Sequence, residues 1–224
     1  SKRAEVLELK EGVTELSSPA LTALFSIVRD VSTPTKDYVW NADLLMQMIS
    51  LECLGILAAN KPKDVSTPCG IFKGTTMPNF TDLTAVSIMR SGCALADAFR
   101  RVTPGSKVGK ILIQRDEEDP EKRAKLFYSK LPSSIASGTV VVTDPMVATG
   151  GSMICALKVL VDAGVKEENI VVLCVVACPE GIKRVVEAYP QLKIIAGAID
   201  SHLNEHKYIV PGLGDYGDRY YGTN

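Results

Sequence analysis

The chain has 224 residues, of which 46% are hydrophobic and 23% are charged, and its formal net charge at pH 7 is -1. This composition is ordinary for a soluble globular protein and excludes a largely disordered chain, so we expect residues 1–224 to form one domain. Because the net charge is close to zero, no global field attracts nucleic acid or an anionic membrane, and neither is predicted as a partner.

The N-terminal quarter of the sequence predicts an arm followed by two helices. Residues 1–17 alternate charged and apolar side chains without a clear period, and we expect an arm that a partner subunit partly orders. Ser18 is a good N-cap with proline at the first helical position, which predicts a first helix. Thr35 or Asp37 can cap a longer helix that continues to about Asn60. Residues 18–60 are thus predicted to be helical.

From residue 83 onward, β-rich runs alternate with helical stretches, and this rhythm is typical of a parallel α/β fold. The predicted strands are residues 83–89, 108–114, 138–144, 169–177 and 192–199. The predicted helices are residues 92–102, 152–163 and 179–189, each long enough for a crossover connection. We therefore expect an open, mainly parallel sheet flanked by helices, with its core in residues 83–200.

Six cysteines lie in apolar stretches without paired short spacing: Cys53, Cys69, Cys93, Cys155, Cys174 and Cys178. Such spacing favours reduced thiols that are buried as packing residues in a cytoplasmic protein. The N-terminus shows no basic start followed by an apolar stretch, and no segment approaches the roughly 18 uninterrupted apolar residues of a membrane span. A cytoplasmic location is the expectation.

The segment VVVTDPMVATGGS, residues 140–152, places an apolar strand before an acidic residue, a turn of small residues and a helix. In open α/β sheets, ligands bind beyond the carboxyl ends of the strands, where Asp144 is expected. The small residues from Ala148 to Ser152 allow backbone N–H groups to close on phosphate oxygens at the positive end of the helix. The bland alternative is a tight strand-to-helix turn that Asp144 merely caps.

The sequence DPMVATGGS resembles the phosphoribosyl-diphosphate signature of uracil phosphoribosyltransferases. Most other phosphoribosyltransferases of this fold have two adjacent acidic residues where this chain has Asp144 followed by Pro145. The resemblance extends through IMRSG (88–92), QRDEE (114–118), ACPEG (177–181) and the C-terminal residues 204–223. It implies the type I phosphoribosyltransferase fold, with an N-terminal helical arm and a small C-terminal hood, residues 201–224, that binds the base.

The resemblance also implies a site for 5-phosphoribosyl 1-diphosphate. Its residues would be Arg90, Ser91, Gly92, Arg115, Asp144, Pro145, Met146, Val147, Ala148, Thr149, Gly150, Gly151, Ser152 and Asp215. The catalytic residues among them would be Arg115, Asp144 and Asp215. Arg115 opens the polar segment 114–125, which by itself indicates a solvated hairpin and by resemblance becomes a lid. The family usually has alanine where this chain has Ser91, one small residue for another.

Uracil would be bound by the residues that match the family's base-binding segment, which are Tyr208, Ile209, Gly214, Asp215 and Tyr216. The edge of uracil presents an acceptor, a donor and an acceptor, which backbone groups can match without charged side chains. Most family members have alanine where this chain has Tyr216. The Tyr216 side chain is therefore expected either to cap the pocket or to point outward.

The implied reaction converts uracil and 5-phosphoribosyl 1-diphosphate to UMP and pyrophosphate in pyrimidine salvage. Mg²⁺ would be held mainly by the substrate and water rather than by a dedicated metal site. The family resemblance suggests a homodimer or homotetramer and leaves GTP open as an effector. The alternative is a non-catalytic regulator that senses UMP with the same fold, against which the presence of Arg115 and Asp215 argues.

Overall fold

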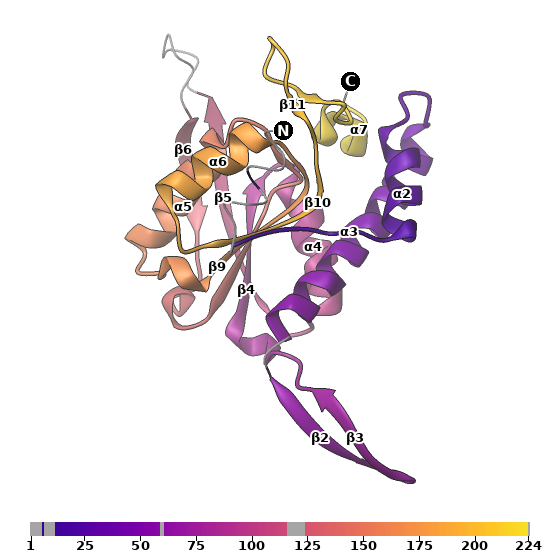
Figure 1. The fold of residues 1–224 in the computed structure, drawn as a ribbon. Helices are drawn as coiled ribbons and strands as arrows, with labels where there is room; N and C mark the ends of the chain where they lie inside the picture. Colours follow the sequence, from indigo (N-terminus) through magenta and orange to yellow (C-terminus); the bar gives the residue numbers. More distant parts are fainter. Residues whose placement is uncertain (1–5, 7–11, 59–60, 116–123, 224) are drawn as a thin grey trace.

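The computed structural model describes residues 6, 12–58, 61–115 and 124–223, except for the side chain of Arg115. An eight-stranded sheet has helices on both of its faces, and a two-stranded hairpin projects from the body (Figure 1). The α/β fold with a mainly parallel sheet is thus confirmed. The sheet strands are, in sheet order, β1 (Val13–Glu15), β10 (Lys193–Ile199), β9 (Ile170–Ala177), β7 (Thr139–Thr143), β4 (Leu83–Met89), β5 (Lys107–Arg115) and β6 (Ala124–Lys130), with β8 (Met146–Val147) beside β9.

Neighbouring strands of this sheet run parallel, with the exception of the antiparallel pair β5 and β6. The two central strands β7 and β9 are buried along almost their whole length, because helices cover both faces. The polar segment 114–125 joins β5 to β6, so the hairpin interpretation of its ends is confirmed. Residues 116–123 between them lie outside the described residues.

The edge strand β1 changes the expectation for the N-terminal arm. Val13 pairs with Ile194, and Glu15 pairs with Ala196, so these residues belong to the sheet of their own chain. The physical reason is that β10 would otherwise be an open sheet edge, whose backbone groups β1 satisfies. Residues 1–5 and 7–11, which we also assigned to the arm, lie outside the described residues.

The described helices are α2 (Pro19–Arg29), α3 (Thr35–Ala58), α4 (Gly92–Val102), α5 (Gly151–Asp162), α6 (Pro179–Ala188) and α7 (Tyr216–Tyr221), with short 3-10 turns at Phe80–Asp82, Ile135–Ser137 and Glu167–Asn169. The predicted cap is confirmed, because the Ser18 side chain accepts a hydrogen bond from the Leu21 N–H at 3.1 Å. Each predicted helix and strand is found within one to two residues of its expected ends, apart from the end of α3, beyond which residues 59–60 lie outside the described residues.

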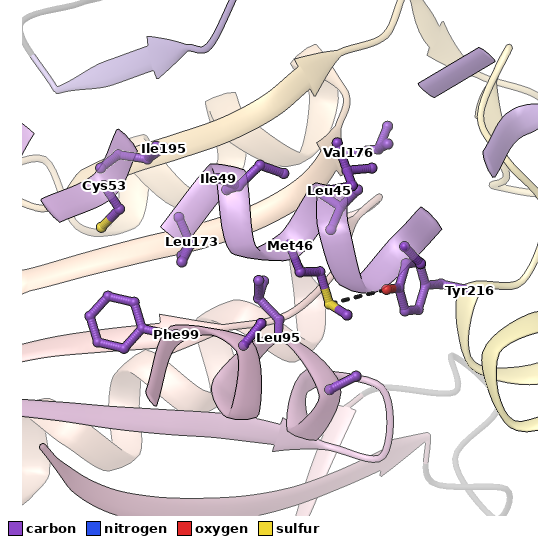
Figure 2. Packing of buried hydrophobic residues seen from close by; sticks show 14 of the residues in the cluster. Leu45, Met46, Ile49, Cys53, Leu95, Phe99, Leu173, Val176, Ile195 and Tyr216 are labelled. Atoms are coloured by element: carbon purple, nitrogen blue, oxygen red, sulfur yellow. Dashed lines mark hydrogen bonds between the residues drawn. The ribbon is translucent and has the colours of Figure 1, made fainter. Parts of the chain in front are cut away.

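Two hydrophobic cores lie on opposite faces of the sheet. One packs α2, α3 and α4 against β9 and β10, and Figure 2 shows Leu45 and Ile49 of α3 with Leu95 of α4 and Leu173 of β9. The other packs α5 and α6 against the opposite face. By length and composition α3 could cross a membrane, and 44% of its most apolar 18-residue stretch is buried in the protein.

Two small antiparallel hairpins lie outside the main sheet. One consists of β11 (His202–Leu203) and β12 (Ile209–Val210), and the other of β2 (Pro62–Thr67) and β3 (Gly70–Thr75). The β2–β3 hairpin extends away from the body (Figure 1) and exposes Ile71 and Phe72, each by 62%. No element was predicted for residues 61–82, so this hairpin is a feature that the sequence interpretation missed.

The thiols only partly match the expectation of buried packing residues. Cys53, Cys174 and Cys178 are buried, whereas Cys93 and Cys155 are half-buried. Cys69 is exposed, because it lies in the turn between β2 and β3, which projects into solvent. All six are free thiols, as predicted.

Candidate functional site

The predicted site residues on three different strands meet at one edge of the sheet. Strands β7, β4 and β5 are parallel neighbours, with Ser87 opposite Thr143 and Met89 opposite Leu112. Their carboxyl ends therefore lie side by side, and Asp144 and Arg90 follow directly after two of them. This is the edge at which open α/β sheets bind ligands.

A pocket opens at the end of β7, lined by Asp144 and residues 146–153. It coincides with the predicted phosphate loop, apart from Pro145. Gly150 has a positive φ of 75° and precedes α5, so the loop turns sharply to bring the first N–H groups of that helix to the pocket. A Cβ at Gly150 would lie 2.9 Å from the Gly181 carbonyl oxygen, which shows how closely α6 supports the loop.

The rear of the loop is fixed by main-chain and thiol contacts from β9 and α6. The Pro145 carbonyl accepts hydrogen bonds from the N–H groups of Val175 and Val176 at 3.0 and 2.9 Å. The Cys178 thiol donates to the Ala148 carbonyl at 2.9 Å, and burial raises the pKa of this thiol to about 11, so it stays protonated and able to donate. Sequence reasoning treated Cys178 as a packing residue and missed this contact. A Cβ at Gly181 would collide with the Ala148 carbonyl.

Asp144 has an unusual electrostatic environment for a carboxylic acid. Burial raises its pKa to about 7, and this outweighs the opposing hydrogen bond that the Met146 N–H donates to Oδ1 at 3.4 Å. Asp144 is therefore only about half ionised at neutral pH. Carboxyl groups with pKa values shifted this far are typical of functional sites. Asp144 can exchange hydrogen bonds with sugar hydroxyl groups as acceptor or as donor.

The loop that carries Arg90 contacts the end of β7, the strand that Asp144 follows. The Thr143 hydroxyl donates to the Gly92 carbonyl at 2.9 Å, and a Cβ at Gly92 would collide with the Thr143 carbonyl oxygen. Gly92 thus lets α4 begin against the end of β7. Ser91 is half-buried and Arg90 is exposed, so the guanidinium is accessible at this edge of the sheet.

Arg115 is the last residue of β5 and pairs with Ala124 of β6. Its backbone is therefore at the same sheet edge as Arg90 and Asp144, one strand further along. The side chain lies outside the description, and the role of residue 115 as part of a lid stays a prediction.

The predicted base-binding segment follows β10 as the β11–β12 hairpin and a loop that leads to α7. Asp200 at the end of β10 is 7% exposed, and its carboxylate accepts hydrogen bonds from Arg29 at 2.8 Å and from the Gly212 N–H at 2.8 Å. Arg29 also donates to the Gly212 carbonyl at 2.7 Å. The turn is thus held by a buried ion pair that the sequence interpretation did not identify.

The base-binding residues themselves differ in their exposure. Ile209 is buried, whereas Gly214 and Asp215 are exposed and the Tyr208 side chain is 54% exposed. Asp215 is the N-cap of α7, and its carboxylate accepts a hydrogen bond from the Asp218 N–H at 2.9 Å. The structure therefore gives Asp215 a capping role in addition to the predicted substrate role.

Both expectations for the Tyr216 side chain are wrong, because it neither caps a pocket nor points outward. The side chain is only 2% exposed and packs in the core, where its hydroxyl donates to the Met46 sulfur at 3.1 Å (Figure 2). Its ring contacts Tyr38 edge-on and stacks on Tyr220. Only the backbone of Tyr216 remains available for a base.

The chain is similar to uracil phosphoribosyltransferases in sequence. A family model described as uracil phosphoribosyltransferase matches residues 15–223. A uracil phosphoribosyltransferase of Dictyostelium discoideum is 44% identical, with 92% of this chain and 94% of the relative covered, and one of Agathobacter rectalis is 40% identical over 94% and 98%. The solved structure of the AQ2163 protein from Aquifex aeolicus is 32% identical, covers 95% of this chain and 99% of its own, and superposes with a TM-score of 0.79.

Proposed function

Because this chain belongs to the uracil phosphoribosyltransferase family, we propose that it transfers the phosphoribosyl group of 5-phosphoribosyl 1-diphosphate to uracil, forming UMP and pyrophosphate. The observation that carries this proposal is the meeting of a phosphate loop, an arginine loop and a base segment at one end of the sheet. The relatives from Dictyostelium discoideum and Agathobacter rectalis are uracil phosphoribosyltransferases by name, which favours the enzyme over the non-catalytic UMP sensor.

The 5-phosphate of the substrate fits the loop from Ala148 to Ser152. The glycines leave backbone N–H groups free of side-chain bulk, and α5 adds its positive end, so a dianion can be bound by a protein with almost no net charge. Asp144 then lies at the entrance of this loop, where its carboxyl group reaches the ribose hydroxyls.

The diphosphate end of the substrate belongs with Arg90 and Arg115. Breaking the bond at the anomeric carbon leaves negative charge on the departing pyrophosphate and positive charge in the ribose ring. Guanidinium groups stabilise the pyrophosphate with paired, charge-assisted hydrogen bonds. Exclusion of water from the site would protect the activated sugar from hydrolysis, which otherwise competes with transfer to uracil. No covalent enzyme intermediate is required.

Uracil fits a site made of backbone groups between Tyr208 and Tyr216, because the Tyr216 side chain is occupied in the core. Its N1 bonds to the anomeric carbon as the bond from that carbon to pyrophosphate breaks, and the N1 proton is released to the departing pyrophosphate or to water. Backbone groups form hydrogen bonds with the other polar atoms of the base. Cytosine reverses two of the hydrogen-bonding polarities, which leaves donors and acceptors unpaired and can cost roughly 10⁴-fold in discrimination.

Mg²⁺ fits this site as an ion that the substrate carries. Among the described residues no group of three or more His, Cys, Asp or Glu side chains can hold a metal ion. Asp144 and Asp215 are single carboxylates, which suits an ion held by one or two carboxylates together with phosphate oxygens and water. When bound, the ion would neutralise diphosphate charge. The proposal also includes activation by GTP. It further includes a cytoplasmic location, which the free thiols favour.

The test of the function is the formation of UMP and pyrophosphate from 5-phosphoribosyl 1-diphosphate with Mg²⁺, comparing four bases. We expect turnover with uracil and a kcat/KM at least about 10³-fold lower for cytosine, hypoxanthine and orotate. Turnover with hypoxanthine or orotate but not with uracil would contradict the base assignment. Absence of turnover with every base would contradict the proposed reaction.

We further propose that the protein is a homo-oligomer and that the β2–β3 hairpin contacts a second copy. An isolated two-stranded hairpin is at best marginally stable in water. This hairpin exposes Ile71 and Phe72 by 62% each and Val65 by 38%, and such clustered apolar surface is typical of an interface. Burial of these side chains against another subunit would stabilise the hairpin.

The variant Phe72→Asp should therefore convert the oligomer to monomer, because a carboxylate cannot be buried in an apolar interface without a large cost. Sedimentation equilibrium measures the mass directly. The matched control is Lys73→Gln on the same strand, whose side chain is 78% exposed and forms a surface ion pair with Asp64, and it should leave the mass unchanged. An unchanged mass for Phe72→Asp would remove the hairpin from the interface.

A further inference from the structure

The guanidinium of Arg90 is held by residues near the C-terminus, and three hydrogen bonds connect Arg90, Asp218 and Thr223 in a ring. Its Nη2 donates to Asp218 Oδ1 at 2.8 Å, and its Nη1 donates to the Thr223 hydroxyl at 3.0 Å. The Thr223 hydroxyl in turn donates to the same Asp218 oxygen at 2.6 Å. The Tyr221 ring lies 5.2 Å from the guanidinium carbon, and its hydroxyl donates to the Arg90 carbonyl at 3.3 Å.

The contact has a steric component as well as a charged one. A Cβ at Gly217 would lie 3.1 Å from Nη2 and 3.6 Å from Nε of Arg90, so the guanidinium rests against the backbone of α7 at this glycine. A side chain at position 217 would crowd the guanidinium, which would have to shift by a few tenths of an ångström. Asp218, Thr223 and Gly217 therefore act on one side of the guanidinium.

Stability alone does not account for this arrangement. The side chains of Arg90 and Asp218 are 52% and 41% exposed, and an exposed ion pair contributes about 0–1 kcal/mol to folding. Of the five N–H groups of arginine, Asp218 and Thr223 accept from two, and the others have no hydrogen-bond partner among residues 12–58, 61–115 and 124–223, which leaves them available for a ligand. A free arginine side chain has many rotamers, and ordering it in advance lowers the entropy that a ligand must offset.

We propose that Asp218 is a positioning residue, which orients Arg90 for the diphosphate of the substrate with the help of Thr223 and Gly217. This inference rests on the proposed function and extends it to the C-terminal helix. Because Asp215 of the predicted base-binding segment is the N-cap of α7, this short helix connects the predicted base site to the group that orients the diphosphate arginine.

The experiment compares Asp218→Asn with wild type in steady-state kinetics for both substrates. Loss of the charge should raise the KM for 5-phosphoribosyl 1-diphosphate about tenfold, because the arginine then has to be ordered on binding. The KM for uracil should change by less than about twofold. The control is Asp162→Asn, which removes a similarly short and somewhat more exposed ion pair with Lys158 on α5 and should change neither KM.

Two further variants separate orientation from a merely structural role. Thr223→Val removes the hydroxyl and should raise the same KM severalfold, whereas Thr223→Ser keeps the hydroxyl and should restore it. Gly217→Ala should raise the same KM by a smaller factor than Asp218→Asn, since the new methyl group crowds the guanidinium and shifts it slightly. The melting temperatures of these variants should stay within about 2 °C of wild type, as expected for exposed contacts.

Calorimetric titration with inorganic pyrophosphate provides a measurement that needs no uracil turnover, so it remains valid if the proposed reaction is wrong. Pyrophosphate should bind about tenfold more weakly to Asp218→Asn than to wild type. Equal or tighter binding would overturn the proposal, since Asp218 would then be irrelevant to Arg90 or would hold it back. Equal rises in the KM of both substrates would also overturn it, because they would indicate a general disturbance of the site.

Discussion

The variant Asp144→Asn should be more stable than wild type above pH 7 and nearly inactive. The stability gain follows from the pKa of Asp144, which burial raises from 3.8 to about 7. Ionising a carboxyl group at that site costs free energy that an amide does not, and the cost corresponds to at most about 4 kcal/mol. Turnover should fall on the order of 10²-fold, because the amide cannot supply a negative charge near the ribose hydroxyls.

The pH dependence of this effect has a definite sign. A carboxyl group whose folded pKa is higher than its unfolded pKa favours folding while it is protonated, so its contribution is fully present below about pH 4. It is lost progressively as the pH rises to about 7, and the penalty is constant above that. The stability difference between Asp144→Asn and wild type should therefore grow between pH 4 and 7.

Urea denaturation at several pH values measures the stability difference, and pH profiles of kcat/KM measure the functional one. If Asp144 acts as a carboxylate, the wild-type kcat/KM for 5-phosphoribosyl 1-diphosphate should rise as the pH increases through about 7. The kcat/KM of the variant should show no such rise. A variant that is less stable than wild type at pH 8 would refute the burial argument. A variant with full activity would remove Asp144 from the mechanism.

The second large effect is expected at the ion pair between Arg29 and Asp200, which supports the turn of the predicted base-binding segment. Asp200→Asn should lower the free energy of unfolding by about 2–4 kcal/mol, because it leaves the partly buried Arg29 without its counter-charge. The same change weakens the hydrogen bond to the Gly212 N–H and so loosens the turn before Gly214. The KM for uracil should rise about tenfold or more, and the KM for 5-phosphoribosyl 1-diphosphate should change much less.

A double variant separates the two consequences of losing Asp200. Replacing both partners, Arg29→Met with Asp200→Leu, leaves no unpaired charge, so most of the lost stability should return. The hydrogen bonds of both side chains to Gly212 remain absent, so the KM for uracil should stay high. A normal uracil KM in either variant would show that the turn needs no support from Asp200.

The sheet and its helices could be predicted because the sequence pattern and the tertiary structure agree there. Runs such as residues 169–177 are long, β-branched and apolar, and Ser18 followed by Pro19 is a strong helix start. The tight turn between β7 and α5 could be predicted for the same reason, since small residues between a strand and a helix leave few alternatives for the backbone, and its role in binding phosphate stays a prediction. These signals are local, and they need no knowledge of which strands become neighbours.

The features that were missed depend on contacts between residues far apart in the sequence. The burial of Tyr216 requires Met46 on α3, and the orientation of Arg90 requires Asp218, and neither partner can be identified from spacing. The β2–β3 hairpin did have a local signal, because Val65 to Thr67 and Ile71 to Phe72 flank a turn containing Pro68 and Gly70. That signal is weak, because Lys63, Asp64 and Lys73 interrupt the apolar pattern of the two strands.

The pairing of β1 with β10 has a consequence for synthesis on the ribosome. Val13 leaves the exit tunnel long before its partner Ile194 has been translated, so the first strand cannot take its place until the sheet is almost finished. The turn at Gly212 and helix α7 emerge later still. The nascent chain can therefore acquire its central strands and phosphate loop while the base segment and the Arg90 contacts are missing. Arrested chains of increasing length should bind phosphate-containing ligands before they bind uracil.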